Sequence, residues 1–111
     1  MEFSIQPYLN NAAILQQTAE QIQKDFSFFD VQLLLNADSY DTLNSQVLPY
    51  VQRISKNNSQ KLYQLLYRID VSEMQIKNAS EKNPEQALEE IITTLIIKRC
   101  LQKVVLKKIF S

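Results

Sequence analysis

The sequence of 111 residues contains no glycine. Two-residue β-hairpins usually need glycine or Asn-Gly at positive φ, and loops that cradle phosphate groups need glycine so that the backbone can approach the phosphate. An antiparallel β-meander, a Rossmann turn and a P-loop are therefore all disfavoured. Short connections between helices through asparagine and aspartate remain possible, so the lack of glycine favours an all-α fold.

Length and composition favour one helical domain over residues 1–111. A chain of this size buries roughly two-thirds of the surface that it exposes when unfolded, which is enough for one ordinary core. Its 45% hydrophobic and 22% charged residues are typical of a globular protein and not of a disordered one.

Residues that carry catalysis or bind metals are scarce. The sequence lacks histidine, the commonest general base and transition-metal ligand, and its one cysteine, Cys100, cannot build a disulfide framework or a thiolate zinc site. Glu85, Glu89 and Glu90 lie close together, but di-iron sites in helical bundles pair glutamates with Glu-x-x-His motifs. We therefore expect no enzymatic activity, cofactor or metal site, and we expect Cys100 to be a buried structural thiol.

Two features bear on location and partners. Glu2 is acidic where a signal peptide is basic, and no run of 18 apolar residues occurs, so we expect a cytoplasmic protein without a membrane partner. The formal net charge is zero, but residues 1–55 hold six acids and two bases (−4), whereas residues 56–111 hold six acids and ten bases (+4). The two halves can attract each other, within one chain or between two copies.

Hydrophobic periodicity predicts three helices in the first 69 residues. The first covers about 8–29, because its apolar residues recur at alternating spacings of four and three and so share one face. That stripe consists of Tyr8, Ala12, Leu15, Ala19, Ile22, Phe26 and Phe29. The second helix covers about 41–55, with Ser39 or Asp41 as its cap and a kink or restart at Pro49, and the third covers about 59–69. Residues 30–36 are too few to distinguish a strand from a buried helical turn.

Capping motifs predict two further helices. Asp70 with Glu73, or Ser72 with Gln75, forms a capping box that begins a short fourth helix, and residues 77–82 form a polar break. The sequence Asn83-Pro84-Glu85-Gln86 then predicts a last helix that begins at residue 84 and ends near 109.

The last helix is apolar around nearly its whole circumference between residues 91 and 106, which is typical of a central, buried helix. Frequent β-branched residues leave a terminal strand through 104–106 as an alternative. We expect a bundle of four or five helices with this helix at its centre, and we expect Leu95→Asp to unfold it. Because four short helices leave part of such a helix uncovered, we also expect a homodimer with Ile109 and Phe110 at the edge of its interface.

Two polar groups are candidate interaction sites. Tyr67, Arg68 and Asp70 could orient a carboxylate of a ligand or protein partner, although we favour a structural interpretation: Asp70 caps a helix, Arg68 pairs on the surface, and Tyr67 is half-buried. The basic residues near the end form the second group. They are Lys98, Arg99, Lys103, Lys107 and Lys108.

The basic group could contact phosphates of a nucleic acid or of a membrane surface, but no aromatic residues are interleaved with it for base stacking. We favour a solvated helix end that matches the helix dipole and faces the acidic first half of the chain. The predicted function is thus a non-enzymatic, self-associating helical interaction module. Weak nucleic-acid binding through the basic helix end is the less favoured alternative.

Two stretches of the sequence carry a family resemblance. Residues 62–73 contain the motif Leu-Tyr-Arg-Ile-Asp, and residues 95–105 contain the motif Ile-Lys-Arg-x-Leu-Gln-Lys-Val. They resemble a small family of short, uncharacterised cytosolic proteins from Bacteroidetes-type bacteria, and the likeness covers most of the chain. It implies a bacterial cytoplasmic setting, and it implies no activity, cofactor or partner.

Overall fold

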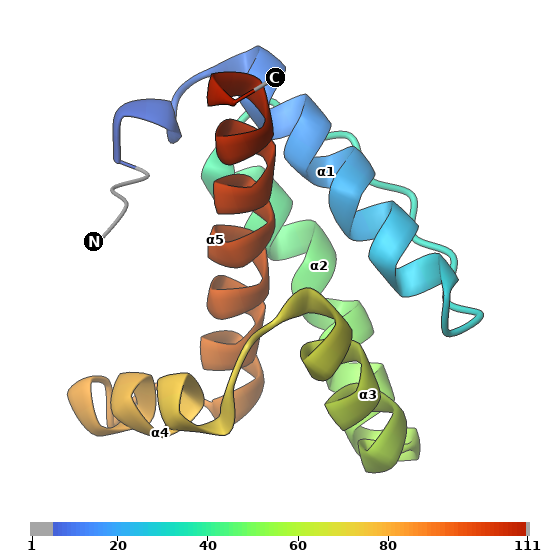
Figure 1. Ribbon diagram of the computed structural model, residues 1–111. Coiled ribbons are helices and arrows are strands. Elements are labelled where there is room, and N and C mark those ends of the chain that lie inside the picture. The colour runs from blue at the N-terminus through green and yellow to red at the C-terminus, as the bar shows by residue number, and fades with distance from the viewer. Residues whose placement is uncertain (1–5, 111) are drawn as a thin grey trace.

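The computed structural model describes residues 6–110, which form five α-helices after one short 3-10 helix (Figure 1). The elements are η1 (Gln6–Tyr8), α1 (Ala12–Ser27), α2 (Tyr40–Asn57), α3 (Ser59–Ile69), α4 (Glu73–Lys82) and α5 (Leu88–Ile109). The described residues contain no strand, so the predicted all-α fold is confirmed and the alternative of a strand at 104–106 is wrong.

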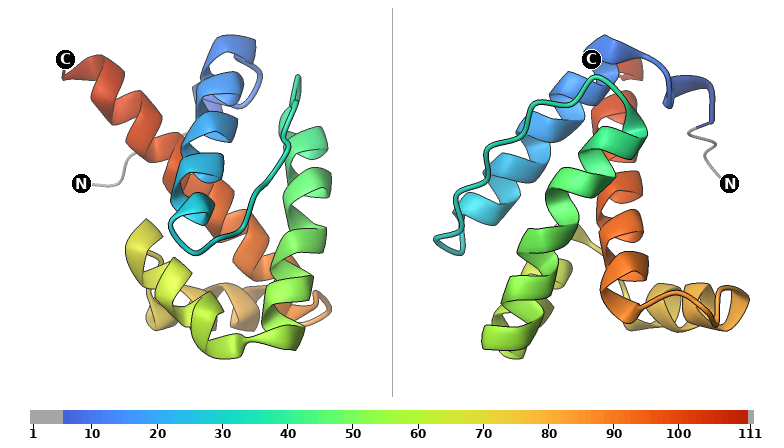
Figure 2. Two further views of the ribbon diagram at one scale, coloured as in Figure 1. Left: turned by 90° about the vertical axis from the view of Figure 1, so that its right-hand side faces the viewer. Right: turned by 180° about the vertical axis from the view of Figure 1, so that it is seen from behind.

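Helix α5 lies at the centre of the fold, as predicted. It contacts each of the other four α-helices, with α1 and α2 packed along it and α4 leading into its start (Figures 1 and 2). Its inward side is fully apolar except for one threonine. The buried residues of α5 are Ile91, Ile92, Thr93, Ile96, Ile97, Cys100, Leu101, Val104 and Val105.

Helix α1 is shorter than the predicted 8–29. It begins after Asn11, whose Oδ1 accepts a hydrogen bond from the Ile14 amide at 3.0 Å, and it ends at Ser27. The apolar stripe continues beyond both ends because Tyr8, in η1, and Phe29, in the following turn, still pack against the core. Apolar spacing alone therefore overstated the helix.

Residues 31–37 form neither of the two predicted alternatives. The segment is extended, its side chains alternate between the core and the solvent, and it runs between α1 and α2 (Figure 2). Glutamine side chains form the hydrogen bonds to its backbone that a neighbouring strand would otherwise form. The Leu35 amide donates to Gln23 Oε1 at 3.1 Å, and the Asn36 amide donates to Gln46 Oε1 at 3.0 Å. Gln46 Nε2 donates in return to the Asn36 carbonyl oxygen at 3.1 Å.

Helices α2 and α3 lie close to their predicted positions. Ser39, and not Asp41, caps α2 by accepting a hydrogen bond from the Thr42 amide, and the helix continues through Pro49 without restarting. Helix α3 has the predicted bounds.

The predicted boundary between the last two helices is wrong. Helix α4 begins with the Ser72–Gln75 capping box and continues through the expected polar break to Lys82, although none of its residues is buried. Asn83 ends this helix, since its side-chain amide donates to the Ala79 carbonyl oxygen at 2.9 Å. Pro84 occupies a turn closed by a hydrogen bond from the Gln86 amide to the Asn83 carbonyl oxygen.

Helix α5 therefore begins at Leu88 and not at residue 84. The Glu90 side chain accepts a hydrogen bond from the Ala87 amide at 3.1 Å, which caps the helix start. Glu89 and Glu90 lie in the first turn, where acids favour the helix dipole, but Glu85 precedes the helix.

Candidate functional site

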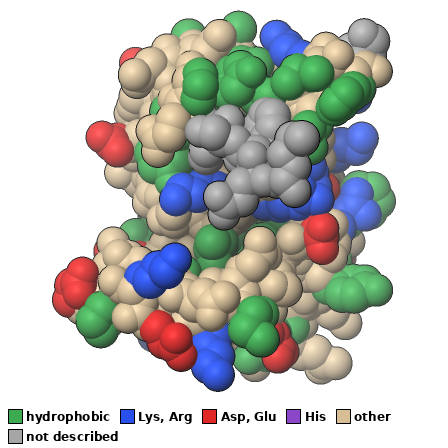
Figure 3. Space-filling model, turned by 60° about the vertical axis from the view of Figure 1, so that its left-hand side comes forward, with side chains coloured by type: hydrophobic (Ala, Val, Ile, Leu, Met, Phe, Trp, Pro, Cys, Tyr) green, Lys and Arg blue, Asp and Glu red, His purple; other side chains and the backbone are tan. Residues whose placement is uncertain are grey.

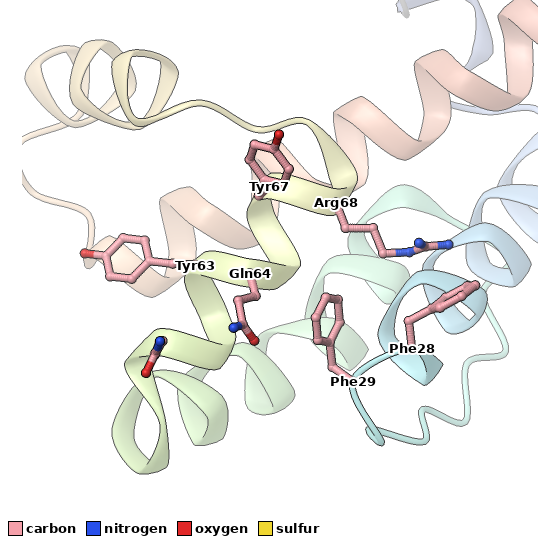
Figure 4. Close-up of a pocket in the computed structure, with 7 residues that line it drawn as sticks. Phe28, Phe29, Tyr63, Gln64, Tyr67 and Arg68 are labelled. Atoms are coloured by element: carbon pink, nitrogen blue, oxygen red, sulfur yellow. The ribbon is translucent and has the colours of Figure 1, made fainter.

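A hollow of about 610 Å³ lies between the outward face of α3 and the turn after α1 (Figure 4). We call it the α3 hollow. It is lined by Phe28, Phe29, Gln60, Tyr63, Gln64, Tyr67 and Arg68. Gln60, Tyr63, Gln64 and Tyr67 of α3 follow one another at spacings of three, one and three, so they share one face of the helix.

Aromatic side chains of this hollow are unusually exposed. Phe28 and Tyr63 are each 60% exposed, and Tyr67 is 89% exposed, so the expectation of a half-buried Tyr67 is wrong. Figure 4 shows Tyr63 pointing away from the two phenylalanines, which makes the hollow an open surface and not a closed cage. Exposed tyrosine, phenylalanine and arginine are the side chains enriched in protein interfaces.

Arg68 joins the hollow to the core. Its Nε lies 3.3 Å from Oδ1 of Asp25, an α1 carboxylate whose side chain is only 4% exposed, and its guanidinium lies 3.3 Å from the centroid of the Phe28 ring. Gln21 Nε2 donates to the second Asp25 oxygen at 3.2 Å. Arg68 therefore pairs with a buried acid and not, as expected, on the surface.

Asp70 points elsewhere. It ends α3 in the left-handed conformation, with φ of 73°, which aspartate tolerates better than most residues, and its Oδ2 lies 3.0 Å from Arg99 Nη2. Asp70 therefore caps the end of α3, and Ser72 is the residue that caps the start of α4. The structure does not bring Tyr67, Arg68 and Asp70 together as one binding site.

The predicted basic group is also divided. Arg99 is held by Asp70 and by Gln102, and Lys98 is exposed on another side of α5. The remaining three lysines line a second hollow of about 470 Å³ between α1 and α5, which we call the basic groove. It is lined by Gln17, Glu20, Gln21, Lys24, Lys103, Val104, Lys107 and Lys108.

Cys100 is fully buried in the core, as predicted. Burial, and after it the neighbouring Asp25 carboxylate, raise the pKa of its thiol to about 12, although Lys103 and Arg99 act in the opposite direction. Its Sγ lies 3.8 Å from Asp25 Oδ2. A buried thiol that keeps its proton is a poor nucleophile, so Cys100 is suited to packing and not to catalysis.

Raising the pH from 9 to 12 is expected to destabilise the protein through Cys100. The unfolded thiol ionises above its ordinary pKa of 9.0, while the folded thiol keeps its proton up to about 12, so the unfolded state loses the proton first. The free energy of unfolding should fall by up to about 1.4 kcal/mol per pH unit, on the order of 4 kcal/mol in total. Urea unfolding at several pH values measures this slope.

Cys100→Ala is the control for this prediction, because it removes the titrating group and leaves the other alkaline groups, including Tyr40, in place. The pKa of Tyr40 is also raised, chiefly by burial. The variant should show a shallower pH dependence. Equal slopes in both proteins would mean that Cys100 does not titrate differently in the folded state.

One stripe of α5 lies on the side opposite most of its buried residues, although Leu95 within it still packs against the larger core cluster. Its residues recur at spacings of seven, four, three, four and three, and each is exposed or only partly buried. We call it the outer stripe of α5. It consists of Leu88, Leu95, Arg99, Gln102, Leu106 and Ile109.

Apolar side chains are exposed at both ends of the outer stripe, and Leu88 at its start is 51% exposed. Ile109 is 52% exposed, and Phe110, directly after α5, is 81% exposed. Figure 3 shows hydrophobic side chains gathered at this end of the molecule, where η1 and the end of α5 lie, with Lys and Arg side chains beside them. The residues chosen as the edge of an interface are therefore accessible.

Sequence patterns missed most of the α3 hollow. Phe28, Phe29 and Tyr63 were not predicted as candidate site residues. The sequence does show Tyr63 and Tyr67 four residues apart, on one face of the predicted third helix.

None of the described helices is long and apolar enough to cross a membrane. Within residues 6–110, no three acidic, cysteine or histidine side chains are grouped closely enough to hold a metal ion.

Comparisons with models of known protein families, with curated proteins and with solved structures give no match for this chain. The family resemblance of residues 62–73 and 95–105 stays a prediction.

Proposed function

We propose that the protein is a non-enzymatic interaction module that forms a homodimer through the outer stripe of α5. The observation that carries this proposal is the stripe itself, since four of its six residues are leucine or isoleucine, and three of these, Leu88, Leu106 and Ile109, are exposed or partly buried outside the core clusters. Burying such a face against another copy removes apolar surface from water, at roughly 25 cal/mol per Å².

The distribution of charge supports an antiparallel, two-fold arrangement. Residues 73–90 hold five acids and two bases, Lys77 and Lys82, whereas the end of α5 from residue 98 holds five bases and no acid. The acids are Glu73, Glu81, Glu85, Glu89 and Glu90. A two-fold axis across α5 places the acidic start of one copy beside the basic end of the other, on both sides of the axis.

Three features support binding over catalysis. The sequence has no histidine, the thiol of Cys100 is buried, and the polar groups of Arg68 and Asp70 are engaged with structural partners. Nucleic-acid binding is less well supported, because the described residues that line the basic groove include no aromatic side chain for base stacking.

Light scattering at micromolar concentrations tests the proposal, with a dimer mass expected for the wild-type protein. Leu106→Glu, Ile109→Glu and Phe110→Glu should each weaken association about tenfold or more, because each places a charge in the apolar contact. Circular dichroism should show that each protomer keeps its helices, since all three residues lie outside the buried core.

Leu34→Glu is the matched control. Leu34 is 89% exposed but lies in the extended segment between α1 and α2, away from the outer stripe, so this variant should dimerise normally. A monomeric wild-type protein would overturn the proposal. Equal loss of affinity in the control and in the stripe variants would also overturn it.

A further inference from the structure

We propose that the basic groove between α1 and α5 is a binding site for a small polyphosphate anion. Four lysines line this hollow, which has a volume of about 470 Å³. That volume lies within the range of about 300–1,000 Å³ typical of small-molecule pockets. This inference is independent of the proposed dimer, since the groove lies beside α1 and the outer stripe of α5 does not line it.

The sequence brings the lining residues together from two helices. Gln17, Glu20, Gln21 and Lys24 are separated by three, one and three residues and therefore lie on one face of α1. Lys103 and Lys107 are four residues apart on α5, with Lys108 beside them. Packing of α1 against the second half of α5 through the buried Ile14, Leu15, Leu101, Val104 and Val105 fixes the two faces next to each other.

The charge of the groove favours an anion. Lys24, Lys103 and Lys107 form no ion pair with any residue from 6 to 110, and Glu20 is the one acid among the described lining residues. These three ammonium groups against one carboxylate leave a net charge of +2 in a concave site, without counting Lys108, and the walls of the site concentrate the electric field.

Phosphate chemistry fits this arrangement better than a single carboxylate does. Lysine binds phosphate as a point charge, without the planar geometry that favours arginine for carboxylates. An anion with two or more phosphates can engage lysines on both helices at once, whereas a single phosphate engages fewer of them. Gln17 adds an amide donor at the side of the groove, while the amide of Gln21 already donates to Asp25.

Isothermal titration of the folded protein with sodium tripolyphosphate at low ionic strength tests the site. We expect saturable binding with a stoichiometry of one per chain that weakens as salt is added. Lys103→Gln and Lys107→Gln should each weaken it about tenfold. Glu20→Gln should tighten it, because this variant removes the one carboxylate of the lining.

Lys82→Gln is the charge-matched control: it changes the net charge equally but lies at the end of α4, far along the chain from the groove, and should bind normally. Equal weakening in Lys82→Gln and Lys103→Gln would overturn the proposal in favour of non-specific attraction. The proposal would also be overturned if inorganic phosphate bound as tightly as tripolyphosphate, or if only an oligonucleotide bound. The dimer mass is measured separately, so failure here leaves the proposed function intact.

Discussion

Replacing Ile96 with aspartate is expected to abolish cooperative folding. Ile96 is 0% exposed and belongs to the larger core cluster, in the middle of α5, where a new carboxylate would be surrounded by apolar side chains. Burying an unpaired charge, together with the loss of a large apolar side chain, costs several kcal/mol, which approaches the whole stability of a small domain. Thermal unfolding followed by circular dichroism should show no cooperative transition.

Leu95→Asp provides the matched comparison, and the structure changes what is expected of it. The sequence predicts Leu95 at the centre of the buried apolar segment, but Leu95 lies on the outer stripe and is only partly buried, at the edge of the larger core cluster. Its aspartate can reach water, so the variant should stay folded with a loss of about 1–2 kcal/mol. If both variants melted alike, α5 would not have the buried and outward sides described above.

The central position of α5 could be predicted because nearly every turn of this helix carries apolar residues on all sides. A helix at the periphery of a fold buries only one face and is typically apolar on that face alone. Helix α3 could also be placed correctly, since both of its ends are marked. Asn58 caps its start by accepting from the Lys61 amide, and Asp70 ends it in a left-handed conformation. Strong local determinants at both ends leave little freedom for tertiary contacts to move a boundary.

The junction of α4 and α5 could not be predicted, because Asn-Pro fits two local structures equally well. Asparagine before proline can cap a helix that begins at the proline, and the same pair can occupy the first two positions of a turn. Here Asn83 already closes α4 through its side chain, so Pro84 continues into the turn. Periodicity did not find the second half of α4 because the helix buries none of its residues.

The α3 hollow escaped prediction for a different reason. Its residues come from the turn after α1 and from α3, and only the packing of these two elements makes them neighbours. The partner of Arg68 illustrates this: the sequence predicts only that Arg68 pairs on the surface, whereas the structure pairs it with the buried Asp25 in α1. Spacing along a helix identifies shared faces but says nothing about which distant face lies opposite.

Arg68→Met is expected to destabilise the fold by about 3 kcal/mol. This value is the lower end of the loss caused by removing one partner of a buried ion pair, because the Arg68 side chain is 33% exposed and partly solvated. The reason is Asp25, which would keep its buried carboxylate with only the Gln21 amide and the Cys100 thiol as described partners. Urea unfolding measures the loss.

Asp25→Leu and the double variant Asp25→Leu/Arg68→Met complete a thermodynamic cycle around this pair. Asp25→Leu should lower the free energy of unfolding by less than Arg68→Met does. An unpaired Arg68 can turn its guanidinium to water and keep its contact with the Phe28 ring, whereas an unpaired Asp25 cannot reach water. The double variant should therefore be more stable than Arg68→Met alone, since a leucine at position 25 leaves no buried charge. A loss below about 0.5 kcal/mol in Arg68→Met would place the pair among solvent-screened surface ion pairs and would remove the link between the α3 hollow and the core.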